Sequence, residues 1–180
     1  MRQRLLLLPC ALFCLAAAAP VKAPLKPVSP KAAPAPATPN FDIQNPQTLI
    51  DLLTLAGAKA QIAHRDSDAV FVTASSTVAA FSMQFAGCSA QGRACRAMLL
   101  DHTLEHGQVT LPQLNQFNQT SVMCRLYQDH SGFQHVVYST VLFRSDNRAD
   151  AAVHLQAWQG CIADARDFEK DPVAYLANAA

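Results

Sequence analysis

The sequence has few charged residues and no strong excess of either sign. Asp, Glu, Lys and Arg make up 15% of the 180 residues, and the formal net charge is +1. From Phe41 onward, however, nine Lys and Arg residues stand against thirteen Asp and Glu residues, which leaves a charge of −4. A mildly acidic domain lacks the positive surface that phosphate backbones require, so nucleic acid is disfavoured as a partner.

Signatures of catalysis are also missing. The serines lack the strand–turn–helix context of a nucleophile elbow, and no pair of carboxylates falls on a predictable cleft. The histidines are scattered and are expected mainly at the surface: His64, His130, His135 and His154. We therefore expect no catalytic residues, no cofactor and a protein that is not an enzyme.

Only one long apolar run is present, at residues 5–19, and it follows a short basic start. Its fifteen residues are fewer than the roughly 20 that a membrane-spanning helix needs, and it ends in small side chains. We predict a signal peptide at residues 1–18. A lipid anchor on Cys10 or Cys14 is disfavoured because proline and phenylalanine precede them, where small residues are needed. We expect a periplasmic or secreted protein without an integral membrane segment after cleavage.

A proline- and alanine-rich segment follows, and we predict a disordered linker at residues 19–44. Residues 20–40 contain seven prolines together with Lys22, Lys26 and Lys31. Such a segment cannot bury enough apolar surface to offset the entropy lost on ordering, so an extended tether is expected. It is either a plain spacer or a basic arm that touches an anionic surface.

The remaining residues, 45–180, form the predicted domain, whose first contacts begin near Phe41. Asn45 before Pro46 and Thr110 before Gln113 are typical helix starts. Period-two alternation predicts strands at 58–62 and 80–85, and further strands are predicted at 69–74, which is rich in Val and Phe, at 94–100, at 122–127 and at 133–143, which is apolar on both faces. A last long helix is predicted to begin at Asp146 or Asn147. The order α-β-β-β-β-α-β-β-α indicates an α+β fold with a largely antiparallel sheet flanked by helices.

Four cysteines lie beyond the predicted signal peptide, and an even number in an exported chain suggests disulfides. Cys88 and Cys95 bracket a six-residue loop, a spacing that suits a structural disulfide better than a zinc pair or a Cys-x-x-Cys redox motif. Cys124 and Cys161 lie on apolar faces of a strand and a helix. They either form a second disulfide or remain two buried thiols.

Asp101, His102, Glu105 and His106 form the pattern Asp-His-x-x-Glu-His. On a helix the two histidines would share a face and could share a metal ion. The stretch leads out of a strand towards Gly107, and no third ligand is set by the sequence. We interpret it as a solvated loop and expect no metal site.

Several short motifs resemble the YbjN family of bacterial domains, which are often labelled sensory-transduction regulators. They cover roughly residues 45–170 in the family's order: 49–57, 85–88, 95–96, 114–118 and 125–132, followed by a closing helix with Trp158 and Phe168. The resemblance implies a fold similar to type III secretion chaperones. Those relatives bind other proteins and are often dimers, so a protein partner and a homodimer are expected assemblies.

Candidate binding residues lie within these motifs: Arg96, Asn115, Phe117 and Asn118. For the two asparagines the alternative is that they cap backbone groups at the end of their helix. The function we expect is a non-enzymatic exported binding or adaptor module, chaperone-like, that recognises a protein segment in the bacterial envelope. The alternative is an inhibitor or sensor of an envelope hydrolase that makes its contacts through the Cys88–Cys95 loop.

Overall fold

A computed structural model describes residues 41–104 and 109–178. The predicted signal peptide and the linker up to residue 40 lie outside the described residues. The described residues belong to one compact unit, Pro39–Ala180. Its elements are α1 (Pro46–Leu55), β1 (Lys59–Arg65), β2 (Ala69–Ser75), β3 (Ala80–Ala86), β4 (Ala97–Thr103), α2 (Leu111–Thr120), β5 (Cys124–Gln128), β6 (Gln134–Val141), α3 (Arg148–Lys170) and α4 (Pro172–Asn178).

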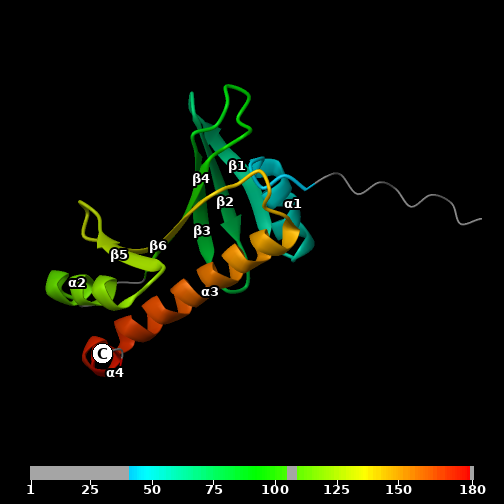
Figure 1. The fold of residues 1–180 in the computed structure, drawn as a ribbon. Coiled ribbons are helices and arrows are strands. Elements are labelled where there is room, and N and C mark those ends of the chain that lie inside the picture. Colours follow the sequence, from blue (N-terminus) through cyan, green and yellow to red (C-terminus); the bar gives the residue numbers. More distant parts are fainter. Residues whose placement is uncertain (1–40, 105–108, 179–180) are drawn as a thin grey trace, which may run out of the picture. The chain divides into compact units, whose positions relative to one another are not determined.

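The six strands form one antiparallel sheet in the order β1-β2-β3-β4-β6-β5 (Figure 1). Strands β1 to β4 follow one another as a meander. The chain then passes through α2 to β5, so that β6 returns to pair with β4. The α+β class and the antiparallel sheet are confirmed, and β1 and β5 are the two edge strands.

The helices start where the sequence predicts because the cap residues satisfy their first free amide groups. The Asn45 side chain accepts a hydrogen bond from Gln47 N ahead of Pro46. Thr110 and Gln113 form a reciprocal capping box at α2. Asn147 does the same with the third residue of α3.

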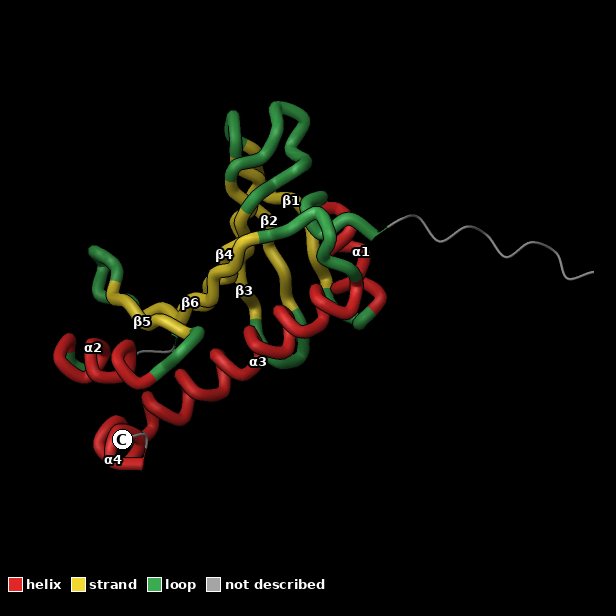
Figure 2. Tube along the Cα trace, viewed as in Figure 1, coloured by secondary structure: helices red, strands yellow, loops and turns green. Residues whose placement is uncertain are grey.

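Helices α1, α2 and α3 pack against the same face of the sheet, and α4 packs against α3 and α2 (Figure 2). Alternate strand residues point towards them, including Val72, Met83, Phe85 and Leu100, which are fully buried. Met83 and Phe85 therefore face the helices, as expected for alternate residues of a half-buried strand. The opposite face carries no helix among the described residues, and we call it the open face.

Residues 41–44, which the sequence analysis assigned to the end of the linker, pack against the domain. Ile43 is only 1% exposed, and Phe41 contacts the core. The Gln44 side chain donates to Leu142 O at 3.0 Å, and the backbone carbonyl of Gln44 accepts from Cys95 N at 2.9 Å. The segment therefore covers the start of β4 and the chain that leaves β6.

The described residues contain two disulfides, Cys88–Cys95 and Cys124–Cys161. The first closes the loop between β3 and β4. The second joins the start of β5 to the middle of α3, with the two Cα atoms 5.4 Å apart. The pairing resolves the alternative left open for Cys124 and Cys161. Two disulfides are consistent with an oxidising environment outside the cytosol.

Helices with the length and apolarity required to cross a bilayer are not found among residues 41–104 and 109–178.

The loop predicted around Asp101 and His102 is wrong for these two residues. They belong to β4, which continues to Thr103 because it pairs along its whole length with β6. Asp101 and His102 do not lie on a helix, which the metal alternative assumes. Glu105 and His106 are outside the described residues. Within the described part of the chain, no group of three His, Cys, Asp or Glu residues could hold a metal ion.

Candidate functional site on the open face

The open face is built from the residues that alternate with the core positions of each strand. Asp101 on β4 lies opposite Ser82 on β3 and Val137 on β6. His135 on β6 lies opposite Tyr127 on β5. Because side chains of directly opposed strand residues lie close together, antiparallel pairing gathers these groups from four strands into one patch.

This face is hollowed. A depression of about 570 Å³ lies over β2 to β6 and combines apolar with polar side chains. Its lining residues are Phe71, Ser82, Gln84, Leu99, Asp101, Tyr127 and Val137. A second depression of about 890 Å³ shares Ser82 and Asp101 with it, opens partly on the open face and continues past the ends of β1 to β4 to helix-side residues such as Thr54 and Phe81. The first depression gives the open face a concave surface.

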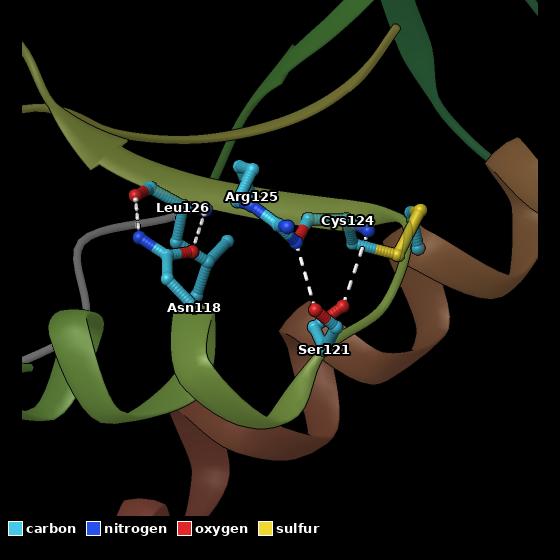
Figure 3. Close-up of a disulfide and its surroundings, with 6 residues drawn as sticks. Asn118, Ser121, Cys124, Arg125 and Leu126 are labelled. Atoms are coloured by element: carbon cyan, nitrogen blue, oxygen red, sulfur yellow. Dashed lines mark hydrogen bonds between the residues drawn. A yellow bond between two sulfur atoms is a disulfide. The ribbon is translucent and has the colours of Figure 1, made fainter. Parts of the chain in front are cut away.

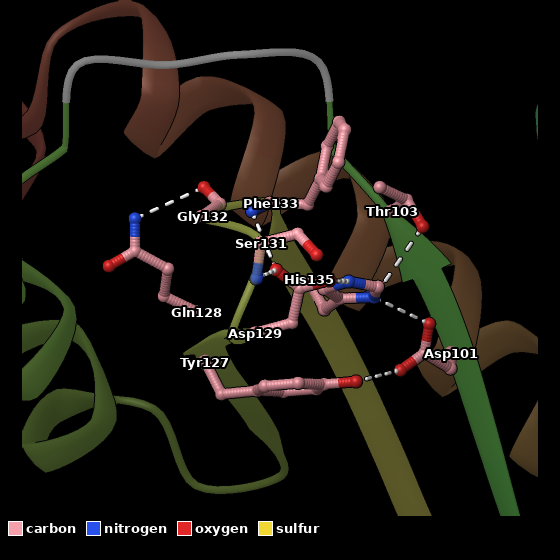
Figure 4. A network of polar contacts seen from close by, with 9 residues as sticks. All are labelled: Asp101, Thr103, Tyr127, Gln128, Asp129, Ser131, Gly132, Phe133 and His135. Atoms are coloured by element: carbon pink, nitrogen blue, oxygen red, sulfur yellow. Dashed lines mark hydrogen bonds and ion pairs between the residues drawn. The ribbon is translucent and has the colours of Figure 1, made fainter.

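A polar network lies at the β5–β6 end of the open face (Figure 4). Asp101 accepts two hydrogen bonds, one from Tyr127 OH at 2.9 Å and one at its other oxygen with His135 Nδ1 at 2.9 Å. The imidazole stacks on the Tyr127 ring, with centroids 4.7 Å apart and planes 12° apart. The side chains of Asp101 and His135 are only 17% and 14% exposed. The network therefore holds a mostly buried carboxylate in one position.

The turn between β5 and β6 contributes a second carboxylate. Asp129 Oδ1 accepts from Ser131 N at 2.9 Å and from Phe133 N at 2.8 Å, and Gly132 adopts a φ of +89°. Asp129 Oδ2 lies 3.6 Å from His135 Nε2. Desolvation works to raise the pKa of Asp129, but the two backbone amides and His135 outweigh it, and the pKa is lowered. Asp129 is therefore negatively charged at neutral pH.

Tyr127 is held in its protonated form. Desolvation, the hydrogen bond to Asp101 and the charges of Asp101 and Asp129 together raise its pKa from 10.0 to about 12. A phenol that stays neutral donates its proton to Asp101 throughout the physiological range. The hydrogen bond that orients the carboxylate is therefore permanent under those conditions.

The arrangement is not that of a Ser-His-Asp triad. In such a triad one imidazole nitrogen faces the carboxylate and the other faces the nucleophile. Here Nδ1 of His135 faces Asp101, and Nε2 faces a second carboxylate, that of Asp129. The Thr103 hydroxyl lies 3.5 Å from Nδ1, on the side that Asp101 already occupies. The network suits a fixed, polar recognition surface.

Asn118 has a structural role (Figure 3). Its side chain donates to Leu126 O at 2.9 Å and accepts from Leu126 N at 2.8 Å. Ser121 Oγ accepts from Cys124 N at 3.1 Å, and Arg125 Nη1 donates to Ser121 O at 2.8 Å. The bonds to Leu126 N, Leu126 O and Cys124 N use backbone groups on the outer edge of β5, so α2 and the turn after it cover the edge that a further strand would otherwise pair with.

The other predicted binding residues are not gathered at one site. Phe117 is 0% exposed and packs against Phe168 with ring centroids 5.0 Å apart, so it belongs to the core. Asn115 is exposed on α2. Arg96 is exposed at the start of β4, where its side chain lies over Gly87 beside the first disulfide. None of the four lines the two depressions of the open face.

Sequence reasoning missed Asp101, Tyr127 and His135 as a unit. The predicted neighbouring strands 122–127 and 133–143 imply that Tyr127 and His135 lie near each other across a hairpin, so this pair could have been predicted. The position of Asp101 beside them could not be predicted, because it depends on the pairing of β4 with β6, and these two strands are separated in the sequence by α2 and β5.

Comparison with family models, with curated proteins and with solved structures gives no match for this chain.

Proposed function

We propose that this protein is a non-enzymatic exported binding module, periplasmic or secreted, that holds a segment of another protein on its open face. The observation that carries the proposal is the concave sheet surface without a covering helix in the described structure. Phe71, Leu99 and Val137 offer apolar contacts, while Ser82 and Gln84 offer hydrogen-bonding groups. This mixture is typical of surfaces that bind peptide segments.

The rigidity of this surface supports the same function. The second disulfide ties β5 to α3, and the Asp101–His135–Tyr127 network ties β5 to β6 and β4. A surface that is ordered before binding loses less conformational entropy when a partner arrives. The resemblance of the sequence to YbjN domains, with their chaperone-like fold, points in the same direction.

A photo-crosslinking amino acid placed on either face of the domain tests the proposal in living cells. Gln84 lines the open face, and Gln156 is exposed on α3. We expect a discrete crosslinked product from position 84 and none from position 156, since both residues are glutamines but only one lies on the binding surface. Equal products from both positions, or no product from position 84, would contradict the proposal.

Substitutions on the two faces of the domain show where the partner binds, because a substitution at the binding surface should remove the crosslinked product. Leu99→Asp places a charge among the apolar groups of the open face, and Val153→Asp places the same charge on α3, where Val153 is 60% exposed. We expect the first variant to lose the product and the second to keep it. If the Leu99 variant keeps the crosslinked product, the partner does not bind at the open face and the proposal is contradicted.

The alternative function, an inhibitor or sensor of an envelope hydrolase, is favoured by the loop between β3 and β4. The Cys88–Cys95 bond closes it, and Gly87, Gly92 and Ala94 adopt positive φ angles, so its conformation is strongly constrained. Figure 1 shows this loop extending beyond the ends of the strands. Under this alternative, Gln91→Asp would abolish the crosslinked product and Leu99→Asp would not.

A further inference from the structure

A shallow hollow of about 280 Å³ lies where the chain passes from α2 into β5. Residues 120–124 form one of its walls, and Asp164 of α3 with Tyr175 of α4 forms the other. None of these residues lines the depressions described above. The hollow is therefore separate from the surface that the proposed function uses.

A disulfide fixes the two walls of this hollow relative to each other. Cys124 belongs to the first wall and is bonded to Cys161, which lies three residues before Asp164 on α3 (Figure 3). Within the first wall, Ser121 Oγ accepts from Cys124 N at 3.1 Å. A site that is ordered before binding loses less conformational entropy when a partner arrives.

The first wall exposes two neighbouring apolar side chains. Val122 is 88% exposed and Met123 is 54% exposed. Apolar contact with a partner would remove this surface from water, which is favourable. The unbranched methionine side chain can also adapt its shape to what it contacts.

The opposite wall presents a carboxylate without a cation. Asp164 has no hydrogen-bond or ion-pair partner among residues 41–104 and 109–178. Desolvation, followed by the charge of Asp167, raises the pKa of the Asp164 carboxyl group. A cation that enters the hollow would favour the charged form and lower that pKa.

The basic side chains on the elements around the hollow are bonded to other groups. Lys170 Nζ lies 2.7 Å from Asp167 Oδ1, and Arg166 donates to Val78 O at 3.1 Å. Arg125 donates to two backbone carbonyls at the start of β5, at 2.8 and 2.7 Å. None of the three cations lines the hollow. The carboxylate is therefore available to a cation from outside the described residues.

We propose that this hollow binds a lysine or arginine side chain of another protein. Such a side chain combines an apolar stem with a charged end. The stem contacts Val122 and Met123, and the charged end pairs with Asp164. A bare metal ion would leave the apolar wall in water, and an apolar side chain would leave the carboxylate without a partner. The proposal goes beyond the open face and does not depend on it.

Two small molecules separate the contribution of the charge from that of the stem. n-Butylammonium is the lysine side chain without its backbone, and 1-butanol has the same stem without a charge. We would titrate the protein, with its disulfides intact, with each molecule at neutral pH and constant ionic strength. n-Butylammonium should shift the Met123 methyl resonance saturably, with a dissociation constant of about 10–100 mM for a ligand of this size. It should also lower the pKa of Asp164, read from the carboxyl carbon resonance, whereas 1-butanol should not.

Two matched variants locate the binding. Asp164→Asn removes the carboxylate from the hollow, and Asp51→Asn removes an exposed carboxylate on α1 that does not line it. Asp164→Asn should weaken the binding of n-butylammonium about three- to fivefold, as expected for a solvent-accessible ion pair, and Asp51→Asn should leave it unchanged. The proposal is overturned by the absence of a saturable Met123 shift, by an equal effect of 1-butanol on the pKa of Asp164, or by undiminished binding in a folded Asp164 variant.

A photo-crosslinking amino acid at Val122 tests the protein partner in living cells. We expect a product in which a peptide of another protein, containing lysine or arginine, is attached at this position, as identified by mass spectrometry. Asp164→Asn should reduce the product, while Leu99→Asp should preserve it and so distinguish this site from the open face. A crosslink to a second copy or to the protein's own chain, a peptide without a basic residue, or no product at all would overturn the proposal.

Discussion

The side chain of Asn118 makes the hydrogen bonds that a neighbouring strand would otherwise make with β5. Its amide group donates to and accepts from the backbone of Leu126, as a strand paired with the edge of β5 would. Asparagine suits the position because its amide carries both a donor and an acceptor. A binding role is predicted for Asn118, but the role that the structure shows is to hold α2 on β5.

Replacing Asn118 with alanine should lower the free energy of unfolding by about 1–3 kcal/mol, because two partly buried backbone groups lose their partner. Urea unfolding measures the change. Asn115→Ala on the same helix is the control, since Asn115 is exposed, and it should change stability by less than about 0.5 kcal/mol. Equal losses in the two variants would show that helix propensity, and not the bonds to Leu126, is responsible.

Tyr127 gives the molecule a dependence on alkaline pH. Its pKa is about 12 in the folded protein and 10.0 when unperturbed, so the folded state keeps the proton between these values while the unfolded state releases it. The contribution of Tyr127 to stability is therefore complete below pH 10 and is lost as the pH rises towards 12. Tyr127→Phe should lose less stability over this interval than the native protein, as measured by melting temperature against pH.

Burial also raises the pKa values of Tyr138 and Tyr175, so part of the alkaline loss remains in the Tyr127 variant. Tyr175→Phe provides the comparison, because Tyr175 is not part of the open-face network. A Tyr127 variant with an unchanged alkaline profile would show that the hydrogen bond to Asp101 does not control this titration.

At the scale of elements, the β5–β6 hairpin depends on contacts beyond its own strand pairing. β5 has only five residues and lies at the edge of the sheet. Three devices hold it: the disulfide to α3, the α2 side chains along its edge and the Asp129 turn that joins it to β6. Each of them acts on a different end or side of the strand, so the polar network beside it keeps its geometry.

The two disulfides should differ in their effect on stability. Cys124 and Cys161 are 37 residues apart and Cys88 and Cys95 only 7, so the first bond restricts the unfolded chain more. Loop-closure entropy predicts losses of about 4 kcal/mol for Cys124→Ala with Cys161→Ala and about 2.5 kcal/mol for Cys88→Ala with Cys95→Ala. Urea unfolding of both double variants checks the order, and a larger loss for the shorter loop would contradict it.

At the scale of the whole molecule, stability should depend on the oxidation state. The two bonds together contribute about 6 kcal/mol by the same estimate, which is comparable to the 5–15 kcal/mol total stability of a typical domain. The reduced protein should therefore be marginally stable. The oxidised and fully reduced proteins, compared by thermal unfolding, should differ by at least about 15 °C. Similar melting temperatures would show that the core alone stabilises the fold and would weaken the link to an oxidising compartment.

The distribution of residues over the two faces of the sheet also belongs to this scale. Helices α1, α2 and α3 cover one face, and α4 packs against α3. The open face keeps Phe71, Leu99 and Val137 only partly buried. A protein that uses this face for binding can change its surface without changing its core, so substitutions such as Leu99→Asp should affect partner capture more than stability.

Features set by neighbouring residues could be predicted from the sequence alone. Asn45, Thr110 and Asn147 cap helices because a cap acts within three residues of itself. The alternation at Phe81, Met83 and Phe85 determines which side of β3 faces the core. Gly132 marks its turn because the positive φ there favours glycine. The helix starts, the strands and the antiparallel class followed from such local signals.

Only the tertiary structure decided which distant groups meet. Asp101 and His135 are 34 residues apart, and they meet because β6 inserts between β4 and β5. The bond between Cys124 and Cys161, the bonds from Asn118 to Leu126 and the absence of a described helix over one face depend on the same arrangement. Local sequence patterns reflect backbone hydrogen bonding and side-chain periodicity over a few residues, whereas contacts between separate elements depend on how all their apolar surfaces pack at once.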